Sequence, residues 1–133
     1  MDYSKIVTER INPRTQNIDT LTIPSIVETL TAEDNLVPKA LQQVRGPIAG
    51  AVHLIVEAFH SKKNLFFVGA GTSGRLGVLE AAECPPTFHT DPKQIQAIMA
   101  GGSSAVFQSR EGAEDNAGTG RDVVRKKIKK GDF

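Results

Sequence analysis

The sequence is poor in cysteine and in large aromatic residues, with one cysteine, one tyrosine and no tryptophan among 133 residues. Because Cys84 has no second cysteine to pair with, an internal disulfide and a multi-cysteine metal site are excluded, and a reducing compartment is expected. Charge of one sign is also lacking, since 16 basic residues stand against 15 acidic ones. No general attraction to nucleic acid or anionic lipid is expected, so any anion must bind at a local site.

Long apolar runs are absent as well. Residues 1–7 contain no apolar signal core, and the most apolar later window is interrupted by His53 and Glu57. His53, His60 and His89 have no metal-ligand spacing with one another, and the six phenylalanines form no stacking platform for single-stranded nucleic acid. We therefore expect a cytoplasmic protein without a membrane span, a nucleic-acid partner or a metal.

The composition, with 39% hydrophobic residues, is that of one soluble globular domain or most of one. The first part predicts helices by apolar spacing and by caps, with Thr31 as the cap of the second helix. The expected segments are an extended arm over residues 8–24, a short helix near 25–30, a helix over 32–44 and a helix over 48–59.

Residues 63–133 predict the first part of an α/β domain. The short apolar run Leu65–Val68 is typical of a strand buried on both faces of a parallel sheet, and Ile95–Ala100 predicts a second strand. A glycine-rich turn and a helix stand between them. This order predicts a right-handed crossover unit, with ligands at the carboxyl ends of the strands.

Beyond the second strand, the sequence predicts two more helices and the start of a third strand. Two parallel strands are too few for a stable sheet, so its remainder is expected from more chain, from a partner or from an unusual packing. The expected segments are a helix from Ser103 or Ser104 through Glu111 and Glu114, a break at Gly118–Gly120, a helix over 121–130 and a strand entered at Asp132 and Phe133.

The glycine-rich turn, Gly69-Ala70-Gly71-Thr72-Ser73-Gly74, fits two well-known nucleotide loops poorly. A dinucleotide site needs an acidic residue at the end of the second strand, but Asp91 precedes that strand. A nucleoside triphosphate loop needs lysine and a hydroxyl after its last glycine, where this chain has Arg75 and Leu76. Both readings are disfavoured.

A phosphate monoester that needs no metal suits the turn better. Within the segment Gly71–Gly74, the hydroxyls of Thr72 and Ser73 stand beside free N–H groups at the positive end of a helix. We therefore interpret these four residues as phosphate ligands. The plainer interpretation is a tight turn in which Ser73 only caps the helix.

Three carboxylates are candidates for acid or base chemistry. Glu83 precedes Cys84 and two prolines, so the helix is expected to end at Glu83 or Cys84, where the negative helix end favours a protonated carboxyl. A solvated surface charge is the alternative. Glu111 and Glu114, three residues apart on a predicted helix, are expected near the turn, with surface charge again as the alternative.

Four motifs carry a resemblance to a known family. They are Thr8-Glu9-Arg10 with Asn12-Pro13, the loop Gly69–Gly77, Glu83-Cys84-Pro85-Pro86-Thr87-Phe88 and Glu111-Gly112-Ala113-Glu114-Asp115. In combination they resemble N-acetylmuramic acid 6-phosphate etherase, over the N-terminal half or less of that family's length. The resemblance implies an α/β fold of the sugar isomerase (SIS) type, a three-layer parallel sheet flanked by helices, incomplete in this chain. It also implies an N-terminal arm and helices over 1–62 and the truncated SIS domain over 63–133.

The resemblance also implies an activity without a cofactor. A cytoplasmic homodimer of cell-wall sugar recycling would eliminate the lactyl ether at carbon 3 of N-acetylmuramic acid 6-phosphate, giving D-lactate and, after hydration, N-acetylglucosamine 6-phosphate. Glu83 looks like the proton donor, Glu114 like the second catalytic carboxylate, and Thr72 and Ser73 like phosphate ligands. The alternatives are a non-catalytic sugar-phosphate-binding regulator and an inactive fragment.

The predicted helix between the loop and Glu83 has a consequence for the site. Ten residues of helix span about 15 Å, more than the distance from a sugar's phosphate to its carbon 3. We therefore expect Glu83 to serve the loop of a partner subunit in a homodimer with shared active sites.

Overall fold

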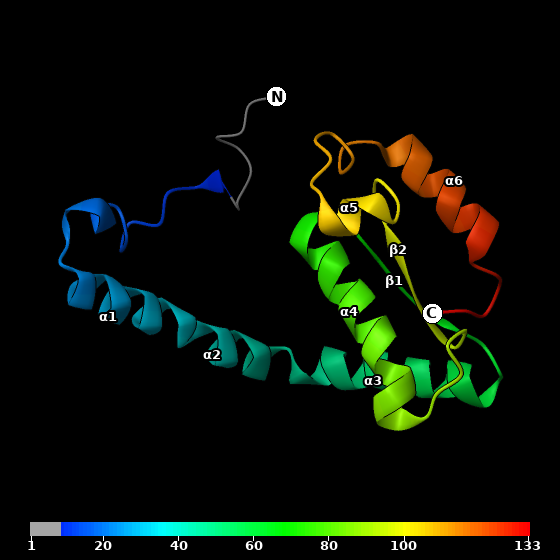
Figure 1. Cartoon of the computed structure of the whole chain (residues 1–133). Coiled ribbons are helices and arrows are strands. Elements are labelled where there is room, and N and C mark those ends of the chain that lie inside the picture. Colours follow the sequence, from blue (N-terminus) through cyan, green and yellow to red (C-terminus); the bar gives the residue numbers. More distant parts are fainter. Residues whose placement is uncertain (1–8) are drawn as a thin grey trace. The chain divides into compact units, whose positions relative to one another are not determined.

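The computed structural model describes residues 9–133, and the chain divides into two compact units, Met1–Ile48 and Ala49–Phe133. Thr8 of the first motif and the start of the predicted arm lie outside the described residues. None of the described helices is long and apolar enough to cross a membrane. The elements are η3 (Ile18–Thr20), α1 (Ile23–Asp34), α2 (Leu36–Gln43), α3 (Arg45–His60), β1 (Leu65–Gly69), α4 (Gly71–Phe88), β2 (Ile95–Met99), α5 (Ser104–Phe107) and α6 (Ala117–Lys127) (Figure 1).

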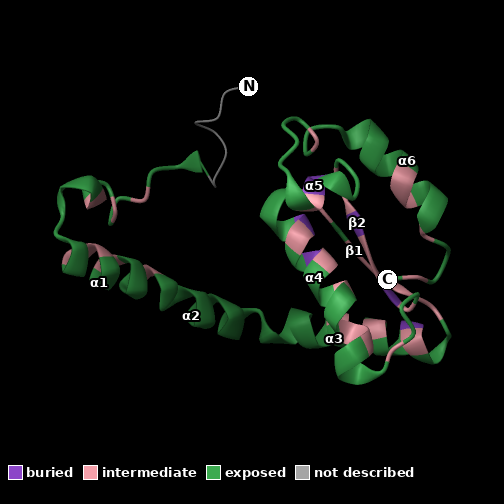
Figure 2. Ribbon diagram, in the orientation of Figure 1, coloured by how far each residue is buried: buried purple, intermediate pink, exposed green. Residues whose placement is uncertain are grey.

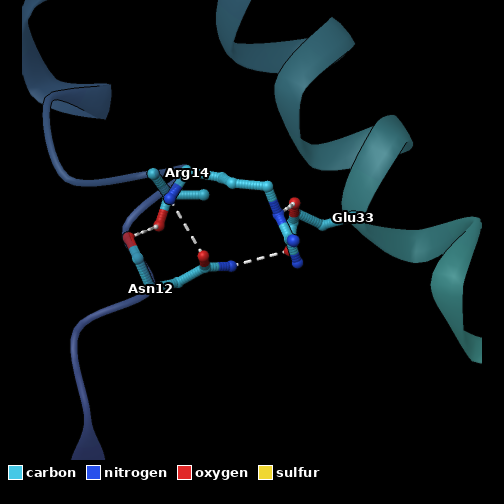
Figure 3. A network of polar contacts seen from close by, with 4 residues as sticks. Asn12, Arg14 and Glu33 are labelled. Carbon is cyan, nitrogen blue, oxygen red and sulfur yellow. Dashed lines mark hydrogen bonds and ion pairs between the residues drawn. The ribbon is translucent and has the colours of Figure 1, made fainter.

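In the first unit, one carboxylate ties the arm to α1. Glu33 accepts hydrogen bonds from Asn12 Nδ2 at 2.7 Å and from Arg14 Nη2 at 2.8 Å, and its other oxygen pairs with Arg14 Nε (Figure 3). The hydrogen bonds from Arg14 and Asn12 hold the pKa of Glu33 below its ordinary value. The Asn12-Pro13-Arg14 part of the arm therefore lies against α1.

The helices of the first unit begin elsewhere than predicted. The cap of α1 is Thr22, whose Oγ1 accepts the Ser25 N–H at 3.4 Å. The prediction that Thr31 caps a new helix is wrong, because α1 continues through Thr31, whose hydroxyl donates to the Val27 carbonyl at 2.8 Å. The break between α1 and α2 falls at Asn35 instead.

The second unit is built on a parallel pair of strands, which confirms the predicted α/β class. Leu65 of β1 stands opposite Ile95 of β2, and the register continues to Gly69 opposite Met99. α4 packs closely on this pair, since a Cβ added at Gly77 would lie 2.7 Å from Phe67 Cβ. The buried apolar residues of the described chain are few and belong to this unit (Figure 2): Ala58, Ile95, Ile98 and Ala105.

The helix between the strands is longer than predicted at both ends. It begins at Gly71 rather than near Gly74, and it ends at Phe88, where His89 adopts a left-handed φ of 56°. The prediction of an end at Glu83 or Cys84 is wrong because α4 continues through Pro85 and Pro86. The residue before proline only tends to avoid helical geometry, and kinked helices are the exception.

The segments after β2 also differ from the prediction. α5 has one turn and ends before Gln108, whose backbone is extended, so Glu111 and Glu114 lie on a loop and not on one helical face. α6 begins at Ala117 and includes Gly118–Gly120, where a break was predicted. The Asn116 side chain caps it by accepting the Thr119 N–H at 2.9 Å, which favours helix despite the glycines.

Phe133 forms two backbone hydrogen bonds along the edge of β1. The Phe133 N–H donates to the Asn64 carbonyl at 2.9 Å, and the Phe133 carbonyl accepts the Phe66 N–H at 2.8 Å. These two bonds have the pattern of a parallel ladder on the edge of β1 away from β2. Phe133 thus lies where the third strand was predicted to begin.

Asp132 fixes this edge pairing. Its Oδ1 accepts the Asn64 N–H at 2.9 Å, and its Oδ2 accepts the Lys129 N–H at 2.9 Å. The backbone hydrogen bonds from Asn64 and Lys129 hold the pKa of Asp132 below its ordinary value. The carboxylate therefore connects the loop before β1 to the segment after α6.

We expect Asp132→Asn to lower the melting temperature at neutral pH, because an amide offers one acceptor oxygen where the carboxylate offers two. Since the folded pKa lies below the unfolded one, the stabilisation is present above about pH 4 and is lost as the pH falls through the folded pKa. The difference between the two proteins should therefore shrink in acid. Melting curves by circular dichroism at pH 7 and pH 3 measure it, and an equal difference at both pH values would contradict this role.

Candidate functional site

A hollow of about 390 Å³ lies where both strands end. Ala70, just after β1, and Met99 and Ala100, at the end of β2, form its base. Gly71 of the glycine-rich turn and Glu114 line it as well. This is the position at which ligands are expected in a parallel α/β sheet, and it brings two predicted site residues together.

The glycine-rich turn presents unused donors at the start of α4. Gly71 has a left-handed φ of 55°, which glycine adopts without a steric penalty. The Gly74 N–H is the first to bond back, to the Ala70 carbonyl at 3.0 Å. Within residues 9–133, the N–H groups of Gly71, Thr72 and Ser73 and the two hydroxyls have no hydrogen-bond partner. Ala70 is the N-cap, so the interpretation of Ser73 as a mere cap is wrong.

Arg75, in the first turns of α4, lines the hollow and connects α4 to α5. Its Nε donates to the Val106 carbonyl at 2.8 Å, and its Nη2 donates to the Ala105 carbonyl at 3.0 Å and to Ser109 Oγ at 3.4 Å. The guanidinium thus satisfies carbonyls of α5 and fixes the start of the loop that carries Glu114. The sequence offered no signal for this contact between residues 30 or more positions apart.

A second, smaller hollow of about 210 Å³ lies between β1 and α4, whose residues line it. Ser73 and Gly74 line it, together with Val68 and Glu80. The predicted phosphate ligands are therefore divided, since Gly71 lines the larger hollow and Ser73 and Gly74 the smaller one. Thr72 lines neither of the two.

Glu83 lies apart from both hollows, ten residues after Ser73 on the same helix, a distance of about 15 Å along the axis. Its helical spacing places it on the face of Leu76 and Leu79, which are 56% and 53% exposed. The structure does not bring Glu83 and Glu114 into one hollow of this chain.

Arg110 is a functional candidate that the sequence analysis did not single out. It lines the larger hollow together with Glu111 and Glu114. Its stem passes over the carboxyl end of β2, since a Cβ added at Gly101 would lie 3.3 Å from Arg110 Cδ. The sequence did contain a signal for Arg110, because it directly precedes Glu111 and lies four residues before Glu114, the two carboxylates predicted near the turn.

Comparison with known proteins places the chain in a family. Residues 47–132 match the family described as the glucokinase regulatory protein N-terminal SIS domain. The chain is 51% identical over 114 residues to N-acetylmuramic acid 6-phosphate etherase of Salinibacter ruber, covering 86% of the chain and 37% of the relative. It is 50% identical over 119 residues to the protein of that name from Gloeobacter violaceus, covering 90% and 39%.

A third relative of the same name, from Glaesserella parasuis, is 49% identical over 117 residues, or 88% of the chain and 38% of the relative. The chain thus spans about two-fifths of the length of the curated relatives it matches. The family match covers more than half of the chain and includes the turn, both strands and the Glu114 loop. The chain belongs to the family described as the glucokinase regulatory protein N-terminal SIS domain, and over about nine-tenths of its length it is similar to N-acetylmuramic acid 6-phosphate etherases.

Proposed function

We propose that this chain is the N-terminal portion of a lyase that cleaves the D-lactyl ether of N-acetylmuramic acid 6-phosphate. The observation that supports the proposal is the hollow at the carboxyl ends of β1 and β2, which is lined by both Gly71 of the glycine-rich turn and Glu114. The names of the relatives supply the substrate. In this proposal residues 1–62 form an arm with helices and 63–133 the sugar-phosphate-binding part.

The turn binds the phosphate of the substrate. The N–H groups of Gly71, Thr72 and Ser73 point out of the positive end of α4, and the hydroxyls of Thr72 and Ser73 add two donors. Gly74 lets the helix start lie close to β1. No metal and no cofactor are needed for this contact.

The chemistry then needs one base and one acid. Carbon 2, next to the aldehyde of the open-chain sugar, loses a proton to the Glu114 carboxylate. The electron pair forms a double bond to carbon 3, the bond from carbon 3 to the lactyl oxygen breaks, and Glu83 protonates that oxygen as D-lactate leaves. Water adds to the unsaturated aldehyde at carbon 3 and gives N-acetylglucosamine 6-phosphate.

Glu83 acts on a substrate held by a second copy of the chain. The distance of about 15 Å from Ser73 along α4 is too long for one sugar phosphate to bridge. The exposed Leu76 and Leu79 beside Glu83 suit an apolar subunit interface. The proposal therefore includes a homodimer with shared sites, in the cytoplasm and in cell-wall sugar recycling.

The assay that tests the lyase proposal is D-lactate release from N-acetylmuramic acid 6-phosphate by the purified chain, with the full-length Salinibacter ruber relative as the positive control. Equal amounts of D-lactate and N-acetylglucosamine 6-phosphate support the proposal. A folded chain that binds the sugar phosphate but releases no lactate would place the reaction outside these 133 residues.

The match to the regulatory-protein SIS family favours one second candidate, a regulator that binds a sugar phosphate without cleaving it. The two candidates differ in what Glu83 does. For a regulator, Ser73→Ala abolishes the response to the sugar phosphate while Glu83→Gln changes little.

A further inference from the structure

We infer that Arg110 binds the lactyl carboxylate of the substrate, and so distinguishes the lactyl sugar phosphate from its product; this inference rests on the proposed function. The substrate carries two anionic groups, the phosphate and the lactyl carboxylate. The turn at Gly71–Gly74 accounts for only the phosphate. The second anion needs a cation in the same hollow.

Two cations line the larger hollow in the described chain, Arg75 and Arg110. The Arg75 guanidinium is engaged by the carbonyls of Ala105 and Val106 and by Ser109 Oγ. The Arg110 guanidinium has no hydrogen bond or ion pair within residues 9–133. Arg110 is therefore the cation that remains free for a ligand.

The charges around the hollow make such a cation necessary. Glu111 and Glu114 line the same space, so an entering carboxylate is repelled by two negative side chains. A guanidinium binds a carboxylate through two parallel N–H bonds, which fixes its orientation as well as its place. In this inference Arg110 offsets the negative charge of Glu111 and Glu114 and binds the lactyl group, which is the leaving group of the reaction.

The position of Arg110 suits the carboxylate rather than the phosphate. Its stem lies over Gly101 at the end of β2, whereas the unused N–H groups belong to the turn after β1. Arg110 precedes Glu114 by four residues on one loop. Since the lactyl ether is on carbon 3, next to the carbon that Glu114 deprotonates, the carboxylate falls on the Glu114 side of the hollow.

The test compares two ligands that differ in the lactyl group. We expect Arg110→Gln to weaken binding of N-acetylmuramic acid 6-phosphate by about 10- to 100-fold, the range for loss of a charged hydrogen bond. Binding of N-acetylglucosamine 6-phosphate should stay within about twofold. Arg110→Lys, which keeps the charge but not the paired N–H groups, should show an intermediate loss. Arg125→Gln, an exposed change on α6, is the matched control and should alter neither affinity.

Isothermal titration of the full chain with both ligands gives the result. An equal loss for both ligands in Arg110→Gln would overturn the inference and assign Arg110 to the shared phosphate, and no loss for either would also overturn it. Failure of the unaltered chain to bind N-acetylglucosamine 6-phosphate would overturn the proposed function itself, and the inference with it. The two failures are thus distinguishable.

Discussion

Glu83→Gln is expected to lower D-lactate release by about 10²- to 10⁴-fold, the usual contribution of a general acid. Glutamine keeps the shape and the hydrogen-bonding ability of the side chain but has no proton to give to the lactyl oxygen. Because Glu83 is proposed to act on the ether oxygen while the turn holds the phosphate, the sugar phosphate should still bind with nearly unchanged affinity. The rate of D-lactate release is compared in protein that is active before the substitution, and sugar-phosphate binding is measured by isothermal titration.

Glu57→Gln, an exposed change on α3, is the control and should retain the activity. If Glu83→Gln releases D-lactate at the rate of the unaltered protein, Glu83 is not the proton donor. If binding falls as far as release, Glu83 has a structural role instead. In the shared-site proposal, mixed dimers of a Glu83→Gln chain and a Ser73→Ala chain recover activity, and the absence of recovery refutes sharing.

Gly74→Ala is expected to destabilise the second unit by about 1–3 kcal/mol, the cost of inserting a methyl group into a tightly packed contact. The new Cβ would lie 2.5 Å from Met99 Sδ and 2.6 Å from the Gly69 carbonyl oxygen. The sulfur can move, but the Gly69 backbone is paired in β1, so α4 must shift away from the sheet. That shift also disturbs the donors of the turn, and sugar-phosphate binding should fall with stability.

Gly120→Ala provides the control within the same chain. Gly120 lies in α6, and a Cβ there would have no atom within 4 Å. Alanine should leave stability unchanged or raise it by up to about 1 kcal/mol, because glycine is the poorer helix former. Thermal unfolding by circular dichroism compares the two variants, and a Gly74→Ala protein that melts like the unaltered chain would show that α4 adapts without cost.

The strands and the place of the larger hollow were predictable because their signals are local. Leu65–Val68 is an apolar run of strand length, and Ile95–Ala100 is apolar except at Gln96. They become β1 and β2 with only small changes at their ends. The turn between β1 and α4 follows from its glycines. The turn and the Glu114 loop lie near each other because the strands of a parallel sheet have their carboxyl ends at the same edge.

The errors arise where distant contacts decide the local structure. Arg75 donates to the carbonyls of Ala105 and Val106 in the one-turn helix α5, and Glu114 lies on the loop that follows. The cap from Asn116 carries α6 across the glycines. Residues that are neighbours in the turn, such as Gly71 and Ser73, line different hollows because the side chains of successive helical positions point in different directions.

The phosphate contact of the turn is the central claim, and amide chemical shifts measure it most directly. The full chain, labelled with nitrogen-15, is titrated with N-acetylglucosamine 6-phosphate and, separately, with N-acetylglucosamine. We predict that the phosphorylated sugar shifts the amides of Gly71, Thr72 and Ser73 first and most strongly, and that the sugar without phosphate leaves them in place. Equal shifts with both sugars, or shifts confined to other residues, would contradict the account.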